Sequence, residues 1–147
     1  MKSKVIVGIL GAFGLVATLA FGALPGSEAG KTVRDGVYTS EQADRGEQVV
    51  VDFGCTNCHG TELQGGAEEQ PPLLGEQFVN AWTGRKLDEL AAKITTMPAD
   101  RAPAYQVKAA GAADVVAYLL RSNGYPAGDA ELPSDADSLR QIEIVAP

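Results

Sequence analysis

The chain has 147 residues, of which 45% are hydrophobic and 21% are charged, and its formal net charge is −7. This composition is ordinary for a globular protein and leaves room for one domain. The excess of acidic residues argues against nucleic acid as a partner.

Residues 1–29 have the order of a secretory signal peptide. Lys2 and Lys4 precede twenty uncharged residues, Val5 to Leu24, and Ser27 and Ala29 are small residues suited to a cleavage site. We predict cleavage after Ala29. The apolar run exceeds the ~7–15 residues usual for a signal and matches the ~20 that span a bilayer, so an uncleaved anchor stays an alternative.

Both alternatives place the rest of the chain in the periplasm, either free or held at the inner membrane by an N-terminal apolar helix. Removing residues 1–29 leaves ten basic and eighteen acidic residues, a net charge of −8. Such a surface either keeps the protein soluble or steers a charged partner toward it.

Residues 30–38 are expected to be a polar lead-in, and a helix is expected to begin after Thr39. Thr39 and Gln42 have the spacing of a capping box. Small or apolar residues then recur at helical spacing, at Ala43, Gly46, Val50 and Phe53. A glycine inside a helix is unfavourable by about 1 kcal/mol, which close contact with another helix would explain. The valines at 49–51 leave a short strand open as an alternative.

Residues 55–60 read CTNCHG and contain both cysteines and the only histidine of the chain. The pattern C-x-x-C-H predicts covalent haem attachment, with thioethers at Cys55 and Cys58 and His59 as the proximal ligand of the iron. A redox dithiol and a metal site are the alternatives. A structural zinc site needs four ligands, and the motif offers three.

The segment 60–77 is rich in glycine and proline and is expected to be a long loop around a flat cofactor. Phe78 and Trp82 follow and suit a wall that faces the haem. The Trp82 indole N–H is suited to a haem propionate, and a core tryptophan with a solvent-facing nitrogen is the alternative.

An amphipathic helix is predicted over residues 84–95, and a last helix over 112–123, with Gly124 as its C-cap. Met97 lies between them in an irregular stretch. Because the chain has no second histidine and its other methionine is Met1, Met97 is the conventional candidate for the second axial ligand. A lysine or an open position are the alternatives.

The tail, residues 126–147, is predicted to be an acidic extension whose apolar end packs back on the domain. Four acidic residues cluster within it: Asp129, Glu131, Asp135 and Asp137.

The order of elements along the chain resembles class I cytochrome c: a helix, C-x-x-C-H, a proline- and glycine-rich loop, a short helix, Met-Pro and a closing helix. The resemblance covers Thr39 to Gly124 and implies an all-α fold, with residues 39–125 as the cytochrome domain around one haem c. It implies that Cys55 and Cys58 hold the haem and that His59 and Met97 ligate the iron.

The resemblance also assigns roles to three other positions. Pro71 begins a segment similar to the family's Pro-x-Leu-x-Gly, whose proline carbonyl accepts a hydrogen bond from the ligand histidine. The family's glycine before that proline is Gln70 here. Gly46 and Tyr118 resemble the small and aromatic pair where the first and last helices cross.

Residues 112–144 resemble single-haem cytochromes that accompany periplasmic quinoprotein dehydrogenases. This implies a one-electron carrier that accepts electrons from a periplasmic dehydrogenase and passes them to a cytochrome or terminal oxidase of the respiratory chain. A permanently docked or membrane-anchored haem subunit is the first alternative. A haem peroxidase or a dithiol oxidoreductase is the second, and the lack of a spare histidine disfavours the peroxidase.

Overall fold

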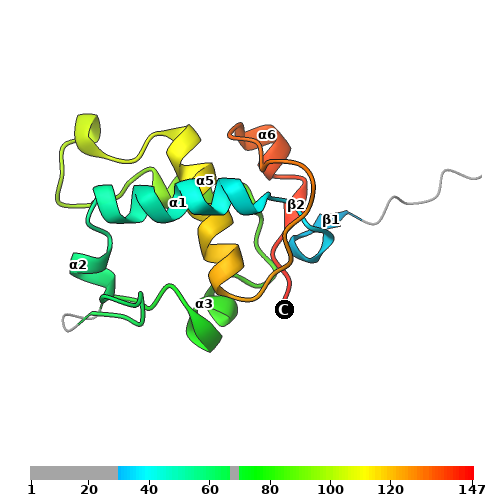
Figure 1. Cartoon of the computed structure of the whole chain (residues 1–147), viewed down its shortest axis with the longest axis horizontal. Coiled ribbons are helices and arrows are strands. Elements are labelled where there is room, and N and C mark those ends of the chain that lie inside the picture. Colours follow the sequence, from blue (N-terminus) through cyan, green and yellow to red (C-terminus); the bar gives the residue numbers. More distant parts are fainter. Residues whose placement is uncertain (1–29, 67–69) are drawn as a thin grey trace, which may run out of the picture.

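Two helices cross at the centre of the domain, α1 (Ser40–Asp52) and α5 (Ala109–Ser122) (Figure 1). They belong to a computed structural model that describes residues 30–66 and 70–147. The shorter helices are α2 (Thr56–His59), α3 (Gly75–Trp82), α4 (Leu87–Ile94), α6 (Ala136–Leu139), η1 (Val33–Asp35) and η2 (Pro103–Tyr105). The valines at 49–51 are helical, so the alternative of a short strand there was wrong.

Gly46 lets the two central helices approach closely. A β-carbon at this position would overlap the carbonyl oxygen of Asp114 and come within 2.9 Å of the Tyr118 Cβ. The predicted contact between Gly46 and Tyr118 is therefore confirmed, and the α5 backbone at Asp114 makes the approach tighter still. Any larger side chain would push the helices apart.

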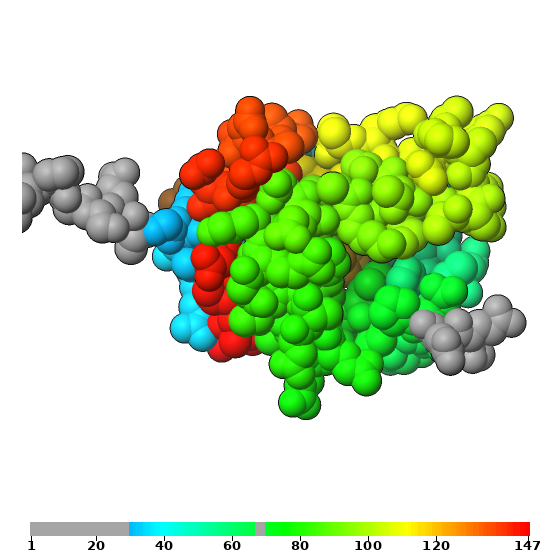
Figure 2. Space-filling model, turned by 180° about the vertical axis from the view of Figure 1, so that it is seen from behind, coloured from blue at the N-terminus to red at the C-terminus, as the bar shows by residue number. Residues whose placement is uncertain are grey.

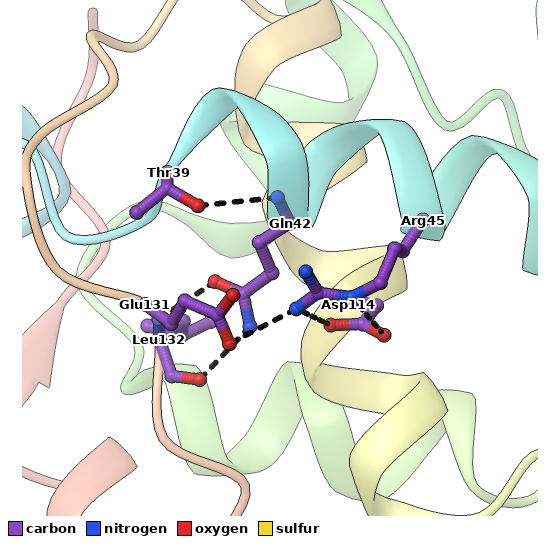
Figure 3. A network of polar contacts seen from close by, with 6 residues as sticks. All are labelled: Thr39, Gln42, Arg45, Asp114, Glu131 and Leu132. Carbon is purple, nitrogen blue, oxygen red and sulfur yellow. Dashed lines mark hydrogen bonds and ion pairs between the residues drawn. The ribbon is translucent and has the colours of Figure 1, made fainter.

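The start of α1 differs in one respect from the predicted capping box. The Thr39 hydroxyl accepts a hydrogen bond from the Gln42 N–H at 3.1 Å, as expected for an N-cap. The Gln42 side chain does not return to Thr39. It is buried, its Nε2 donates to the Leu132 carbonyl at 2.9 Å, and its Oε1 accepts from the Leu132 N–H at 2.6 Å (Figure 3). The Gln42 side chain thus holds the tail against α1. The N-cap at Thr39 is confirmed, and the predicted return hydrogen bond from Gln42 to Thr39 was wrong.

Residues 30–38 are not the simple polar lead-in that their composition predicts. Val33 and Tyr38 are 0% and 1% exposed, and the Tyr38 hydroxyl donates to the Tyr125 carbonyl at 2.7 Å. The Gly128 N–H of the tail donates to the Tyr38 carbonyl at 2.7 Å, and the local sequence gives no sign of this contact. The segment therefore contributes three buried side chains to the core, Val33, Val37 and Tyr38.

The two ends of the described chain meet in a short parallel pair, β1 (Lys31–Thr32) and β2 (Ile142–Glu143), with Lys31 opposite Ile142. Apart from this pair and a single bridge between Lys86 and Glu143, the regular structure of residues 30–66 and 70–147 is helical. Ile144 is buried, and its backbone exchanges hydrogen bonds with Gly84 and Arg85 at 2.8 and 2.9 Å. The apolar end of the tail therefore packs on the domain, beside the connection between α3 and α4.

Figure 1 shows the tail, with α6 and β2, at one end of α1 and the helix α2 at the other. The acidic extension and the C-x-x-C-H motif thus lie at opposite ends of the molecule. Within residues 30–66 and 70–147, no helix is long and apolar enough to span a membrane. The predicted apolar segment Val5 to Leu24 lies outside the described residues.

Candidate functional site

A cavity of about 460 Å³ lies beside the C-x-x-C-H motif. Figure 2 shows a hollow between the green segment of α3 and α4, the yellow-green stretch near residue 100 and the blue-green motif segment. Apolar side chains from α1, α3, α4 and α5 form much of the cavity wall: Val50, Phe78, Trp82, Leu90, Ile94, Val115 and Leu119. The cavity is suited to a flat, mainly apolar cofactor.

Local backbone geometry places the motif at this cavity. The chain leaves α1 through Gly54, whose φ of +65° is in the left-handed region that favours glycine. The Cys55 N–H still donates to the Val50 carbonyl, and the His59 N–H donates to the Cys55 carbonyl, at 3.0 and 2.9 Å. One helical turn thereby brings Cys55, Cys58 and His59 to the cavity wall.

His59 is held by the residue that the Pro-x-Leu-x-Gly resemblance indicated. Its Nδ1 lies 2.8 Å from the Pro71 carbonyl oxygen, and the side chain is 8% exposed. A carbonyl can only accept, so Nδ1 carries the hydrogen and the neutral ring keeps its lone pair on Nε2. The substitution of Gln70 for the family's glycine does not displace this carbonyl.

The cysteines differ from those of a dithiol oxidoreductase. Burial raises the pKa of the Cys55 thiol, with the neighbouring Cys58 adding to the effect. A reactive dithiol has the opposite property, because its nucleophilic cysteine needs a lowered pKa. Cys58 is exposed at the cavity edge, and both thiols are free to form thioethers. The raised pKa of Cys55 therefore argues against a role for this cysteine as a redox nucleophile.

Met97 lines the same cavity as His59. Its N–H donates to the Ile94 carbonyl, and its own carbonyl accepts from the Val107 N–H, both at 2.9 Å. These two bonds fix the backbone on either side of the thioether. In a segment without regular secondary structure, these hydrogen bonds hold the Met97 side chain in a defined position at the cavity.

Phe78 and Trp82 lie one turn apart on α3 and face the cavity, with ring centroids 6.4 Å apart. Sequence reasoning missed Arg85, which also lines the cavity. Its guanidinium lies 4.6 Å from the centre of the Trp82 ring and donates to Glu89 at 2.7 Å. The sequence signal that could have found Arg85 is its position three residues after Trp82.

Asn123 is a second residue that the sequence analysis missed. Its side chain accepts from the Gly75 N–H at 2.8 Å and donates to the carbonyls of Leu73 and Leu119, at 3.1 and 2.8 Å. It ties the loop after Pro71 to the end of α5. In the sequence, Asn123 looks only like the end of a helix before a glycine.

The zinc alternative also lacks ligands. Among the residues that the structure describes, no group of three or more His, Cys, Asp or Glu side chains could hold a metal ion. The motif alone would leave a tetrahedral ion incomplete. Two thiols spaced for the vinyl groups of one porphyrin, next to an imidazole with a free Nε2, fit covalent haem instead.

Covalent attachment of haem through a C-x-x-C-H motif in a small helical domain defines the class of c-type cytochromes. The model of the family described as Cytochrome c matches residues 43–123, more than half of the chain. The chain belongs to the cytochrome c family, and it is an electron-transfer protein with one covalently bound haem c. Searches of curated proteins and of solved structures gave no significant match.

Proposed function

We propose that the protein is a periplasmic one-electron carrier in which His59 and Met97 are the axial ligands of the haem iron. In this proposal it accepts electrons from a periplasmic dehydrogenase and passes them to the respiratory chain. The observation that carries the ligand assignment is that both side chains line one cavity with the two cysteines. Bound haem supplies a single electron acceptor and donor, the iron.

The contact between His59 and Pro71 supports the proximal role. A hydrogen bond at Nδ1 fixes the tautomer and the orientation of the ring, which leaves Nε2 as the coordinating atom. It also makes the imidazole more electron-rich and a stronger ligand. Asn123 supports the same geometry from a distance, because it holds Leu73 and Gly75 near Pro71.

The apolar wall supports a carrier with a raised reduction potential. Phe78 is 1% exposed, and low dielectric around the iron disfavours the extra positive charge of the oxidised state. A thioether ligand such as Met97 acts in the same direction. Trp82 and Arg85 offer an indole N–H and a guanidinium at the cavity wall for the carboxylates of the cofactor.

The cellular location and the partners rest on the sequence. The order of charges and apolar residues in 1–29 supports export, and the resemblance of residues 112–144 supports a quinoprotein dehydrogenase as the donor. The alternative is a permanently docked or anchored haem subunit of a dehydrogenase or oxidase. N-terminal sequencing of purified protein separates the two, with Gly30 first for the free carrier and Met1 first for an anchored subunit.

Removing the thioether tests the ligand assignment. We expect the oxidised holoprotein to show the weak near-infrared band of sulfur bound to iron. Met97→Ala should abolish the band, lower the potential and allow cyanide to bind. Ile94→Val is the matched control, because Ile94 lines the same cavity and the change removes volume but no ligand. An unchanged band and potential in Met97→Ala would exclude Met97 as the ligand.

A further inference from the structure

A second hollow, here called the groove, lies next to the haem cavity and has a volume of about 590 Å³. Its walls come from the C-terminal end of α1, the beginning of the C-x-x-C-H motif, and the stretch from Pro98 to Lys108 that contains η2. Gly54 and Pro98 line both hollows, so the groove adjoins the site of electron exchange.

The groove gathers exposed apolar side chains. In the described part of the chain, two large hydrophobic residues are exposed: Val51 at 62% and Tyr105 at 69%. Both line the groove, one from α1 and the other from η2. Single exposed hydrophobic residues need no explanation, but two that converge from distant segments mark an interaction surface. Tyrosine is also enriched at the centre of protein interfaces.

The basic residues at the groove differ from most of the other basic residues in having no ion pair among the described residues. Five of the ten basic residues after position 29 form ion pairs with carboxylates: Arg45, Arg85, Lys86, Arg121 and Arg140.

By contrast, Arg101 and Lys108 line the groove, Lys93 lines the adjoining cavity, and none of the three forms an ion pair among the described residues. The Lys108 ammonium donates only to the Pro103 carbonyl, at 3.0 Å.

Two acidic residues line the groove or the adjoining cavity. Asp52 lines the groove and accepts a hydrogen bond from Gln48 at 2.8 Å, and Asp100 lines the haem cavity. The groove lining therefore carries one net positive charge, from Arg101, Lys108 and Asp52, on a chain that is at −8 without its first 29 residues. Over a Debye length of about 10 Å, a docking partner responds to this local charge more than to the total.

We propose that the groove is the docking surface for a redox protein that presents an acidic rim around a protruding apolar side chain. Val51 and Tyr105 receive the apolar group, and Arg101 and Lys108 pair with the acidic rim. One electron then passes between the partner's redox centre and the haem, and no bond is made or broken. This inference rests on the proposed function and specifies the partner's chemistry.

A protein fits this surface better than an anionic membrane does. The groove is concave, so it accepts a side chain that projects from a partner, whereas a lipid surface presents no such projection. A small, mixed polar and apolar contact of this kind is typical of transient electron-transfer complexes.

An electrode surface can supply the carboxylates and the apolar groups of the proposed partner, without its projecting side chain. The probe is gold coated with a mixed monolayer of carboxylate-ended and methyl-ended alkanethiols, and the measured quantity is the voltammetric signal of the adsorbed holoprotein. Despite its net negative charge, the protein should adsorb on this acidic surface in an electroactive orientation. The signal should fall as salt rises from 10 mM to 0.5 M, because screening weakens the local attraction.

Charge-reversal variants distinguish an effect of the groove on adsorption from an effect of the total charge. Arg101→Glu or Lys108→Glu should weaken adsorption about threefold to tenfold. Lys31→Glu makes the same change in net charge at the opposite end of the molecule, in β1, and should have little effect (Figure 1). Tyr105→Ser should weaken adsorption on the mixed monolayer more than on a purely carboxylate one. Thermal unfolding of each variant checks that the fold is intact.

Three outcomes would overturn the proposal. Equal losses in Arg101→Glu and Lys31→Glu would mean that total charge governs adsorption. A signal on an amine-ended monolayer but none on the acidic one would show that the groove does not control docking, while the protein remains redox-active. Binding of the holoprotein to phosphatidylglycerol vesicles, abolished by Arg101→Glu, would assign the surface to a membrane. No signal on any monolayer would count against the proposed electron-carrier function itself.

Discussion

Gln42 and Leu132 form a reciprocal pair of hydrogen bonds across 90 residues of sequence, at 2.9 and 2.6 Å (Figure 3). Both residues are buried, at 2% and 3% exposure. A side-chain amide here satisfies both the N–H and the C=O of one backbone residue, as a neighbouring strand would do. The tail is thereby held against α1 at a point that carries no regular secondary structure.

Replacing Gln42 with alanine should destabilise the holoprotein by about 2–4 kcal/mol, because two buried backbone groups of Leu132 lose their partners. Urea unfolding of wild type and variant measures the difference. Gln48→Ala on the exposed side of α1 is the matched control and should cost less than about 1 kcal/mol. Equal losses in the two variants would show that the pair contributes no specific stability.

Gly46→Ala should lower the melting temperature, although alanine is the better helix former by about 1 kcal/mol. The new methyl group would overlap the Asp114 carbonyl, a backbone atom that cannot rotate away. Overpacking of this kind costs about 1–3 kcal/mol. Gly111→Ala on α5 is the comparison, because the atoms nearest to its new β-carbon belong to side chains, with Val107 Cγ1 at 3.3 Å, and not to backbone. A stabilised Gly46→Ala would refute the close crossing.

The acidic cluster of the tail should not steer electron transfer. Three of its members have structural partners: Glu131 pairs with Arg45 at 3.0 Å, Asp137 pairs with Arg140 at 3.1 Å, and Asp135 caps α6. The tail contacts the N-terminal half of α1, whereas the C-x-x-C-H motif follows the C-terminal end of α1.

Neutralising Asp129, Glu131, Asp135 and Asp137 together should therefore change the rate of oxidation by ferricyanide less than twofold at 0.1 M salt, where screening acts over about 10 Å. Asp52→Asn beside the haem cavity should change that rate more, and should increase it, because the oxidant is an anion. Stopped-flow mixing measures both. A larger effect from the tail than from Asp52 would restore a steering role for the extension.

Two N-terminal capping carboxylates should contribute to acid unfolding. Hydrogen bonds from the backbone at Thr32 and Ser138 lower the pKa of Asp35 and Asp135, respectively. The unfolded chain therefore binds protons more tightly at these positions than the folded one. The stability that they supply is complete above the ordinary aspartate pKa of ~3.9 and is lost as the pH falls through the lower folded value.

The double variant Asp35→Asn, Asp135→Asn should leave stability near pH 7 almost unchanged, because the asparagine amide oxygen can still accept from the N–H groups of Thr32 and Ser138. Its stability should then fall less steeply than that of the wild type below about pH 4. Urea midpoints measured from pH 3 to pH 7 give both curves. If the stability of the wild type and of the double variant fell equally steeply below about pH 4, the two carboxylates would have no part in acid unfolding.

The sequence by itself determined the cofactor chemistry. Cys55, Cys58 and His59 are contiguous, so one helical turn is enough to bring them together and no distant contact is needed. The start of α1 at Thr39 and the left-handed Gly124 after α5 were also predictable, because caps depend on local backbone and side-chain chemistry. The crossing at Gly46 followed from the resemblance to class I cytochrome c.

Only the tertiary structure decided which distant groups meet. The pairing of Gln42 with Leu132 and the hydrogen bond from Gly128 to the Tyr38 carbonyl both join segments that the sequence separates. The groove depends on the packing that places Val51 of α1 and Tyr105 of η2 around one hollow. Side-chain hydrogen bonds and apolar contacts of this range leave no periodicity in the sequence, because they depend on how the helices pack and not on where each helix begins.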